Sequence, residues 1–161
     1  MTSNPYAVHL GGRDPREIIE STSAALHRLA ERIGPAQIDA APAPAKWSAR
    51  DILCHLADCE VVFAFRLRQT LAEAHHRIQP FDQNRWAEPY ATQDADRALR
   101  TFDALRSWNL ALLDTLTPSQ LAKRVTHPER GEMSFATIVE TMGGHDINHL
   151  KQLEAIAAQR D

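Results

Sequence analysis

The sequence predicts an all-α protein, a four-helix bundle formed by one domain over residues 1–161. Four segments carry apolar residues at the three- and four-residue spacing of an amphipathic helix. The alternation typical of half-buried strands, with its Asn-Gly or Asp-Gly turns, is missing from the sequence. The composition, 43% hydrophobic and 24% charged residues, is typical of a globular core. Four amphipathic helices bury their apolar stripes most simply against one another.

The first predicted helix begins after Asp14, a capping residue, and has Pro15 at its first position. Its apolar residues recur at helical spacing as far as Ile33, and Gly34 with the proline after it ends the helix. Residues 36–46 contain an Ala-Pro-Ala-Pro-Ala run, which predicts a stiff, extended connector.

The second predicted helix starts at Ser48, with Asp51 three residues on at the spacing of a capping box, and runs to about His76. The third is capped near Thr92, and its apolar stripe extends to Leu116. Both helices are long enough to contribute a full stripe to a bundle core.

The fourth predicted helix runs from about Ser134 to Ala158, after a helical turn at 117–118 and a loop that contains 127–128. The connection between the second and third helices, about 77–91, is long for an antiparallel turn. This connection is compatible with an up-down-down-up order in which it crosses the end of the bundle. The spacing alone leaves the simple antiparallel order open as well.

Charge and hydropathy narrow the classes of function. A net charge of −3 and a pI near 6.2 argue against a nucleic-acid partner. No run approaches the roughly 18 apolar residues of a membrane span, and the N-terminus lacks the apolar region of a signal peptide, so we expect a cytoplasmic protein with no membrane partner. Cys54 and Cys59 point about 140° apart on a helix, which predicts free thiols rather than a disulfide.

The fourth predicted helix carries polar residues in the middle of its core-facing seam. The seam follows a 4-3-4-3-4 spacing, and its members are Ile138, Met142, His145, His149, Gln152 and Ile156. A buried polar group without a partner costs about 1–3 kcal/mol, so the two histidines and the glutamine need partners. Residues four apart share one face of a helix, and imidazole is a good ligand for zinc, nickel, copper or iron.

His55 is the best candidate for a third ligand. It belongs to an otherwise apolar row on the second predicted helix, formed by Ile52, His55, Cys59 and Val62. The other five histidines fit a metal site less well and are interpreted as solvated or capping residues: His9, His27, His75, His76 and His127. The segment from His145 to His149 also invites comparison with the HExxH motif of zinc peptidases, but Asp146 is one methylene shorter than the glutamate that acts there as general base.

Four segments resemble the DinB/YfiT-like superfamily of small bundle metalloproteins. They are NPYAVHLGGRDP, APAPAKWSARDILCHLADCE, FDQNRWAE and GGHDINHLKQLE, in the order and at the spacing of that superfamily. The resemblance implies metal ligands at His55, His145 and His149, an up-down-down-up bundle, and homodimers in many members. It also implies thiol-dependent transferase or isomerase activity with bacillithiol or mycothiol, or hydrolase activity.

Three neutral imidazoles would leave one divalent ion, zinc, nickel or iron, with an open coordination position, as in catalytic sites. We expect a water molecule or a low-molecular-weight thiol there, which the ion would activate as hydroxide or thiolate. Glu60 is a candidate second-shell partner or general base, although a salt bridge to an arginine explains it equally well. Asp58 is a candidate for orienting His55 or for a solvated surface position, and Gln152 for binding a ligand or satisfying the seam.

The loop at 81–86 mixes aromatic, amide and charged side chains, and we expect it to cover the metal pocket with Arg85 and Trp86 in contact with substrate. Surface packing without function is the alternative. Gly143 and Gly144 each cost roughly 1 kcal/mol inside a helix, which predicts either a close approach of another segment or a kink.

The leading functional hypothesis is a metal-dependent enzyme that acts on a small molecule, as a low-molecular-weight thiol S-transferase or a hydrolase. One alternative is a metal-binding or stress-related protein without catalysis. Another is a metal-free helical module for dimerisation.

Overall fold

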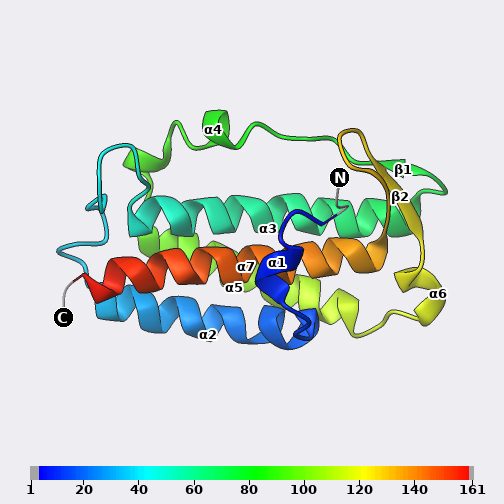
Figure 1. Ribbon diagram of the computed structural model, residues 1–161, viewed down its shortest axis with the longest axis horizontal. Helices are drawn as coiled ribbons and strands as arrows, with labels where there is room; N and C mark the ends of the chain where they lie inside the picture. The colour runs from blue at the N-terminus through cyan, green and yellow to red at the C-terminus, as the bar shows by residue number, and fades with distance from the viewer. Residues whose placement is uncertain (1–3, 160–161) are drawn as a thin grey trace.

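A computed structural model describes residues 4–159 of the chain, and its architecture is a four-helix bundle (Figure 1). Within these residues the four long helices are α2 (Pro15–Ile33), α3 (Ala49–Ala72), α5 (Ala95–Leu113) and α7 (Phe135–Ala158). Helices α2 and α7 run in one direction and α3 and α5 in the other, which confirms the up-down-down-up order (Figure 1). Helix α2 packs mainly against α7, and α3 mainly against α5, so the largest contacts join parallel neighbours.

Local capping explains where the long helices begin. The Asp14 carboxylate caps α2, and Ser48 and Asp51 form the predicted capping box of α3, with the Ser48 hydroxyl accepting from the Asp51 amide at 3.2 Å. Helix α5 starts three residues after the predicted Thr92 because the Asp94 side chain caps it. Ser134 caps α7, which begins at Phe135, one residue after the predicted start.

Four short helical elements complete the described helices. They are α1 (Ala7–Leu10), α4 (Gln83–Trp86), the 3₁₀ turn η1 (Tyr90–Thr92) and α6 (Pro118–Leu121). The capped turn of α6 begins at the predicted Thr117-Pro118 pair. Elements α4 and η1 lie on the crossover from α3 to α5, which runs along the outside of the bundle from one end to the other (Figure 1).

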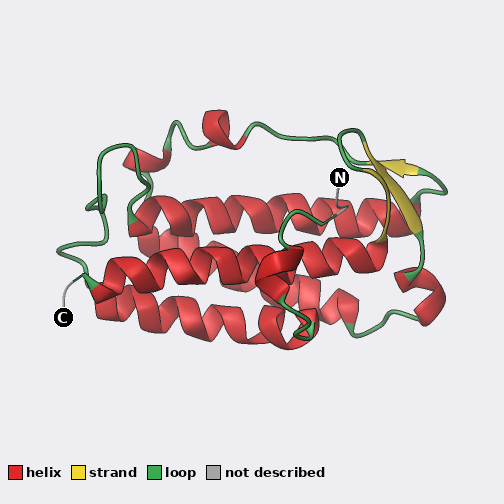
Figure 2. Ribbon diagram, in the orientation of Figure 1, coloured by secondary structure: helices red, strands yellow, loops and turns green. Residues whose placement is uncertain are grey.

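A small sheet at one end of the bundle corrects the expectation of a strandless chain (Figure 2). Its order is β1 (His76–Arg77), β2 (Arg124–His127) and β3 (Gly131–Ser134), with β1 parallel to β2 and β2 antiparallel to β3. Helix α3 therefore ends at Ala72 rather than His76. Strands of two to four residues repeat the alternation too few times to be recognised in the sequence, and the residue that follows the hairpin turn is Gly131, with a φ of 78°, so no Asn-Gly pair marks the turn.

The bundle interior has two apolar clusters separated by a polar layer. One cluster, with Leu26, Leu53 and Phe102, fills the end where α3 and α5 begin. The other, with Phe63 and Phe135, fills the end that carries the sheet. Between them, buried polar side chains come from all four long helices: Thr22, His55, Glu60, Arg106, Asn109, His145, Asp146 and His149. No helix in the described part of the chain is long and apolar enough to cross a membrane.

Candidate metal centre

The structure brings His55, His145 and His149 together inside the polar layer. His145 and His149 are one turn apart on α7, and His55 approaches them from α3. The three ring centroids lie 4.4 to 5.2 Å from one another, and all three side chains are buried.

The spacing of the nitrogen atoms fits a shared ion. The Nε2 atoms of His55 and His145 are 3.1 Å apart. Two nitrogens at about 2.0–2.1 Å from one zinc ion are separated by that distance when the N–metal–N angle is about 100°, close to tetrahedral. The spacing of these two nitrogens therefore fits a divalent metal ion.

Cys59 is a functional candidate that the sequence reasoning did not select as a ligand. It lies one turn after His55, and its Sγ atom is 3.5 Å from the His55 Nε2 and 3.7 Å from the His145 Nε2. The possible ligand atoms of His55, Cys59 and His145 all lie within 4.8 Å of one another, and in the described part of the chain this close group includes Cys59 in place of the predicted ligand His149. The signal that could have found Cys59 is its place in the same helical row as His55.

The environment keeps the three imidazoles neutral. Burial and then the nearby His149 lower the pKa of His55 to about 3. Burial lowers the pKa of His149 to about 4. Burial, followed by the nearby His149 and His55, lowers the pKa of His145 well below its usual value. Neutral imidazole is the form that binds a metal. The Nδ1 atoms of His145 and His149 are buried without a hydrogen-bond partner in residues 4–159, so these are not fully satisfied core histidines.

Two aromatic side chains form walls around the histidines. Trp47, just before α3, lies 4.9 Å from the His55 ring, and Tyr6 meets the His145 ring edge-on at 5.1 Å between centroids. A Cβ atom at Gly144 would lie 2.5 Å from the Tyr6 carbonyl oxygen, and one at Gly143 would lie 3.2 Å from Pro15. The glycines of α7 therefore admit the N-terminal segment to the side of the histidine centre.

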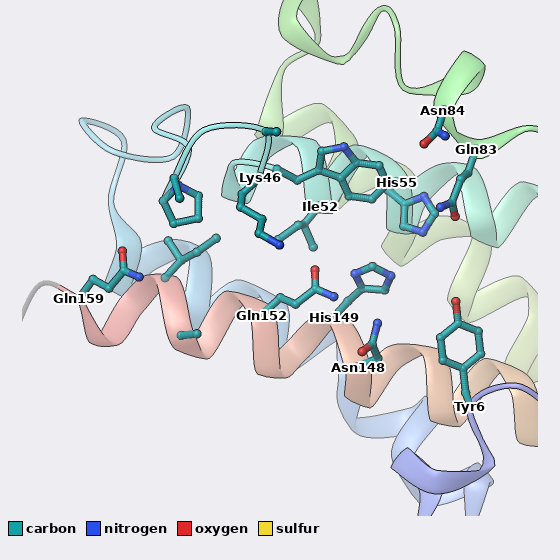
Figure 3. Close-up of a pocket in the computed structure, with 16 residues that line it drawn as sticks. Tyr6, Lys46, Ile52, His55, Gln83, Asn84, Asn148, His149, Gln152 and Gln159 are labelled. Carbon is teal, nitrogen blue, oxygen red and sulfur yellow. The ribbon is translucent and has the colours of Figure 1, made fainter.

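A cavity of about 740 Å³ opens beside His55 and His149 (Figure 3). In Figure 3, Lys46 and Gln152 extend into it from opposite sides. Its lining contains no acidic residue in the described part of the chain, although the protein carries 21 aspartates and glutamates. Its polar lining is formed mainly by Lys46 and five amides: Gln83, Asn84, Asn148, Gln152 and Gln159.

Glu60 forms a buried ion pair on the opposite side of α3 from the histidines. Arg106 Nη2 donates to Glu60 Oε1 at 2.8 Å, and Asn109 donates to Glu60 Oε2 at 3.0 Å. Arg106 also donates to both carboxylate oxygens of Asp146, at 2.7 and 3.1 Å, and Thr22 donates to Asp146 Oδ2. Glu60 and Asp146 therefore line neither the large cavity nor the ligand cluster, and Asp146 does not occupy the place of a peptidase general base.

The remaining predicted site residues divide between the cavity and the surface. Gln152 lines the large cavity. The Asp58 carboxylate accepts a hydrogen bond from the Tyr90 hydroxyl at 2.7 Å and is not bonded to His55. In the loop at 81–86, Arg85 is 79% exposed and Trp86 packs on Phe81 with ring centroids 5.0 Å apart, and neither lines the cavity.

Three of the other histidines bond to residues outside the three-histidine cluster. The exposed His27 bonds to Asp103 at 2.7 Å, and the buried His76, on β1, bonds to Glu73 at 2.7 Å. His127 was expected in a loop but is buried on β2, where it accepts a hydrogen bond from the Glu129 amide. The sequence contained no periodic signal for that short strand.

An up-down-down-up bundle with a buried histidine cluster beside an open cavity defines a class of small helical proteins with a candidate metal centre. The family model described as the DinB superfamily matches residues 18–153, and the chain belongs to that superfamily. This confirms the resemblance that the sequence motifs indicated.

Named relatives and a solved structure agree with this assignment. The protein named "Putative metal-dependent hydrolase YfiT" in Bacillus subtilis is 27% identical, over 95% of this chain and 96% of its own. A protein of Oceanobacillus iheyensis, named "Putative metal-dependent hydrolase OB0782", is 27% identical over 78% of this chain and 73% of its own. The solved structure of YfiT has a TM-score of 0.83 at 24% identity, covers 90% of this chain and 85% of its own, and supports the fold.

Proposed function

We propose that this protein is a metal-dependent enzyme that acts on a small molecule, as a hydrolase or a low-molecular-weight thiol S-transferase. The observation that carries the proposal is the convergence of three neutral imidazoles, two of which, His55 and His149, line the open cavity. A zinc, nickel or iron ion bound by His55, His145 and His149 would supply Lewis-acid activation of a water molecule or a thiol. The names of the relatives support metal-dependent hydrolysis, and the family resemblance supports thiol transfer.

The other residues of the cavity bind and orient the substrate. Lys46 supplies a positive charge, and the amides of Asn148 and Gln152 both donate and accept hydrogen bonds. Trp47 and Tyr6 cover the histidine rings and restrict water around them. A cavity whose described lining has a cation and no carboxylate favours a polar or anionic substrate over a cationic one.

Metal analysis of the purified protein tests the site. We expect about one divalent ion per chain, and a strong reduction in His55→Ala and in His149→Ala. The matched control is His27→Ala, because His27 is exposed and its ring bonds to Asp103 on the neighbouring helix. Stoichiometric metal in both cavity variants would contradict the assignment.

Activity is tested by combining bacillithiol, mycothiol or glutathione with model electrophiles, and by ester hydrolysis without a thiol. His55→Ala serves as the blank in both assays. Equal rates in the wild type and the blank would exclude metal catalysis of the reaction in question.

A second candidate function, metal binding without catalysis, is favoured by the position of Cys59. A fourth protein ligand would close the coordination sphere, as in structural sites. Cobalt substitution separates the two functions, because a thiolate ligand adds an intense sulfur-to-cobalt charge-transfer band in the near ultraviolet. A band that is present in the wild type and absent in Cys59→Ser supports the closed site. A spectrum unchanged by Cys59→Ser supports the open, catalytic one.

A further inference from the structure

A second, smaller cavity of about 180 Å³ reaches the same centre. It shares Tyr6, His55 and Gln83 with the large cavity, and its lining also includes Cys59 and His145. The histidine cluster is therefore flanked by two cavities of different size. The smaller cavity has about a quarter of the volume of the large one, so it suits one small group of a molecule better than a whole substrate.

Two arginines from distant parts of the chain line this second cavity. Arg66 comes from α3, and Arg130 comes from the turn between β2 and β3. Within residues 4–159 neither guanidinium forms an ion pair, and Arg66 Nε is buried without a hydrogen-bond partner. Arg66 is held in place by a hydrogen bond to the Gln79 carbonyl at 3.3 Å and by the Phe81 ring, 5.9 Å from its Cζ.

The positive charges act on one another and on their neighbours. Burial and then Arg130 lower the pKa of Arg66, and burial, Arg130 and Arg66 lower the pKa of His127, which also lines the cavity. Glu129 is the acidic residue of the described lining, and it forms no ion pair with either arginine. The described lining therefore carries two positive charges against the single carboxylate of Glu129, next to a centre of neutral imidazoles.

We propose that the second cavity binds an oxyanion group of a small molecule, a carboxylate or a phosphate, through Arg66 and Arg130. The guanidinium fork matches both oxyanions in geometry, and its hydrogen bonds to them are charge-assisted. This anion site goes beyond the proposed function. It rests on that function only in placing the bound anion beside a metal ion. A substrate would then place its anionic end in the small cavity and its body in the large one.

The test is a titration of the full-length protein with inorganic phosphate and, separately, with acetate, followed by amide chemical shifts in two-dimensional NMR. We expect saturable shifts at the hairpin turn and in α3 near Arg66. Arg66→Gln and Arg130→Gln are each expected to weaken binding about tenfold or more, since a charged hydrogen bond contributes about 1.5–3 kcal/mol. Saturation by phosphate alone would assign the site to a phosphate group, and saturation by acetate would extend it to carboxylates.

Two further variants make the result decisive. Arg124→Gln removes the same charge from β2, where Arg124 is exposed and paired with Glu132 at 2.9 Å, and is expected to leave the affinity within twofold of the wild type. His149→Ala removes a proposed metal ligand, and phosphate binding that still depends on Arg130 in this variant shows that the anion site survives failure of the metal assignment. Absence of binding in the wild type, or binding that is lost in His149→Ala and unaffected by both arginine variants, would overturn the proposal.

Discussion

Two groups of buried polar residues lie side by side in the middle of this bundle, and they differ in how well they are satisfied. The Arg106 network, defined as Glu60, Arg106, Asn109 and Asp146 with Thr22, has every carboxylate oxygen hydrogen-bonded, and its one buried side-chain atom without a partner among residues 4–159 is Arg106 Nε. The histidine centre, defined as His55, His145 and His149 with Cys59, has unpartnered ring nitrogens and opens into cavities.

The two groups use consecutive residues of the same helices. Cys59 precedes Glu60 on α3, and His145 precedes Asp146 on α7. Consecutive residues point about 100° apart on a helix, so one side chain enters the network while its neighbour faces the centre. Burial of a polar residue is therefore a poor guide to function in this fold. The closed group ties the four helices together, and the open group is available for ligands.

Removing the cation of the Arg106 network has the largest expected effect. Arg106→Leu leaves Glu60 and Asp146 buried without their partner, and we expect it to lower the free energy of unfolding by about 3–5 kcal/mol. Urea denaturation measures the loss. The control Arg124→Leu breaks an exposed pair and is expected to cost less than about 1 kcal/mol. A loss of less than about 1 kcal/mol in Arg106→Leu as well would show that the Arg106 network does not stabilise the fold.

Adding metal is expected to stabilise the histidine centre by a smaller amount. A ligand at one hundred times its Kd raises the free energy of unfolding by about 2.7 kcal/mol, provided that it binds only the folded state. We expect zinc to give this increase in the wild type and in His27→Ala, and none in His149→Ala. Denaturation with zinc and with a chelator measures the difference. An equal increase in His149→Ala would locate the zinc elsewhere.

Gly144→Ala tests how the N-terminal segment closes the side of the histidine centre. The new Cβ would overlap the Tyr6 carbonyl, and we expect a net loss of about 1–2 kcal/mol, since overpacking outweighs the gain in helix propensity. Gly143→Ala is the matched control, because its Cβ would meet Pro15 at 3.2 Å, and we expect a smaller loss. Thermal unfolding measures both variants. Equal effects would show that the approach of Tyr6 is not the constraint.

The sequence was sufficient to predict the long helices and the histidine cluster. Amphipathic segments of 19 to 24 residues repeat their pattern over several turns, and caps such as Ser48 mark their starts. His145 and His149 were visible because they interrupt an apolar seam, and the structure places His55 beside them.

The rest depended on contacts between distant segments. The sequence allowed a salt bridge from Glu60 to an arginine but contained no signal that selects Arg106, which is 46 residues away. The sheet was missed because strands of two to four residues repeat the two-residue alternation at most twice, which is too little to stand out in the sequence. The pairing of Arg66 with Arg130 across one cavity depends on that missed hairpin, so it could not be predicted either.

The smallest expected effect concerns the crossover loop at the edge of the open centre. Trp86 and Arg85 were expected to contact substrate, whereas Gln83 lines both cavities and lies beside His55 in Figure 3. We expect Gln83→Ala to raise KM in the thiol or hydrolase assay about two- to tenfold, the equivalent of one hydrogen bond of about 0.5–1.5 kcal/mol. Trp86→Ala, which removes a contact with Phe81, is expected to leave KM within twofold. If KM rose more in Trp86→Ala than in Gln83→Ala, the loop at 81–86 would have to close further over the cavity when substrate binds. The histidine centre would then be less open in the substrate complex than in the free protein.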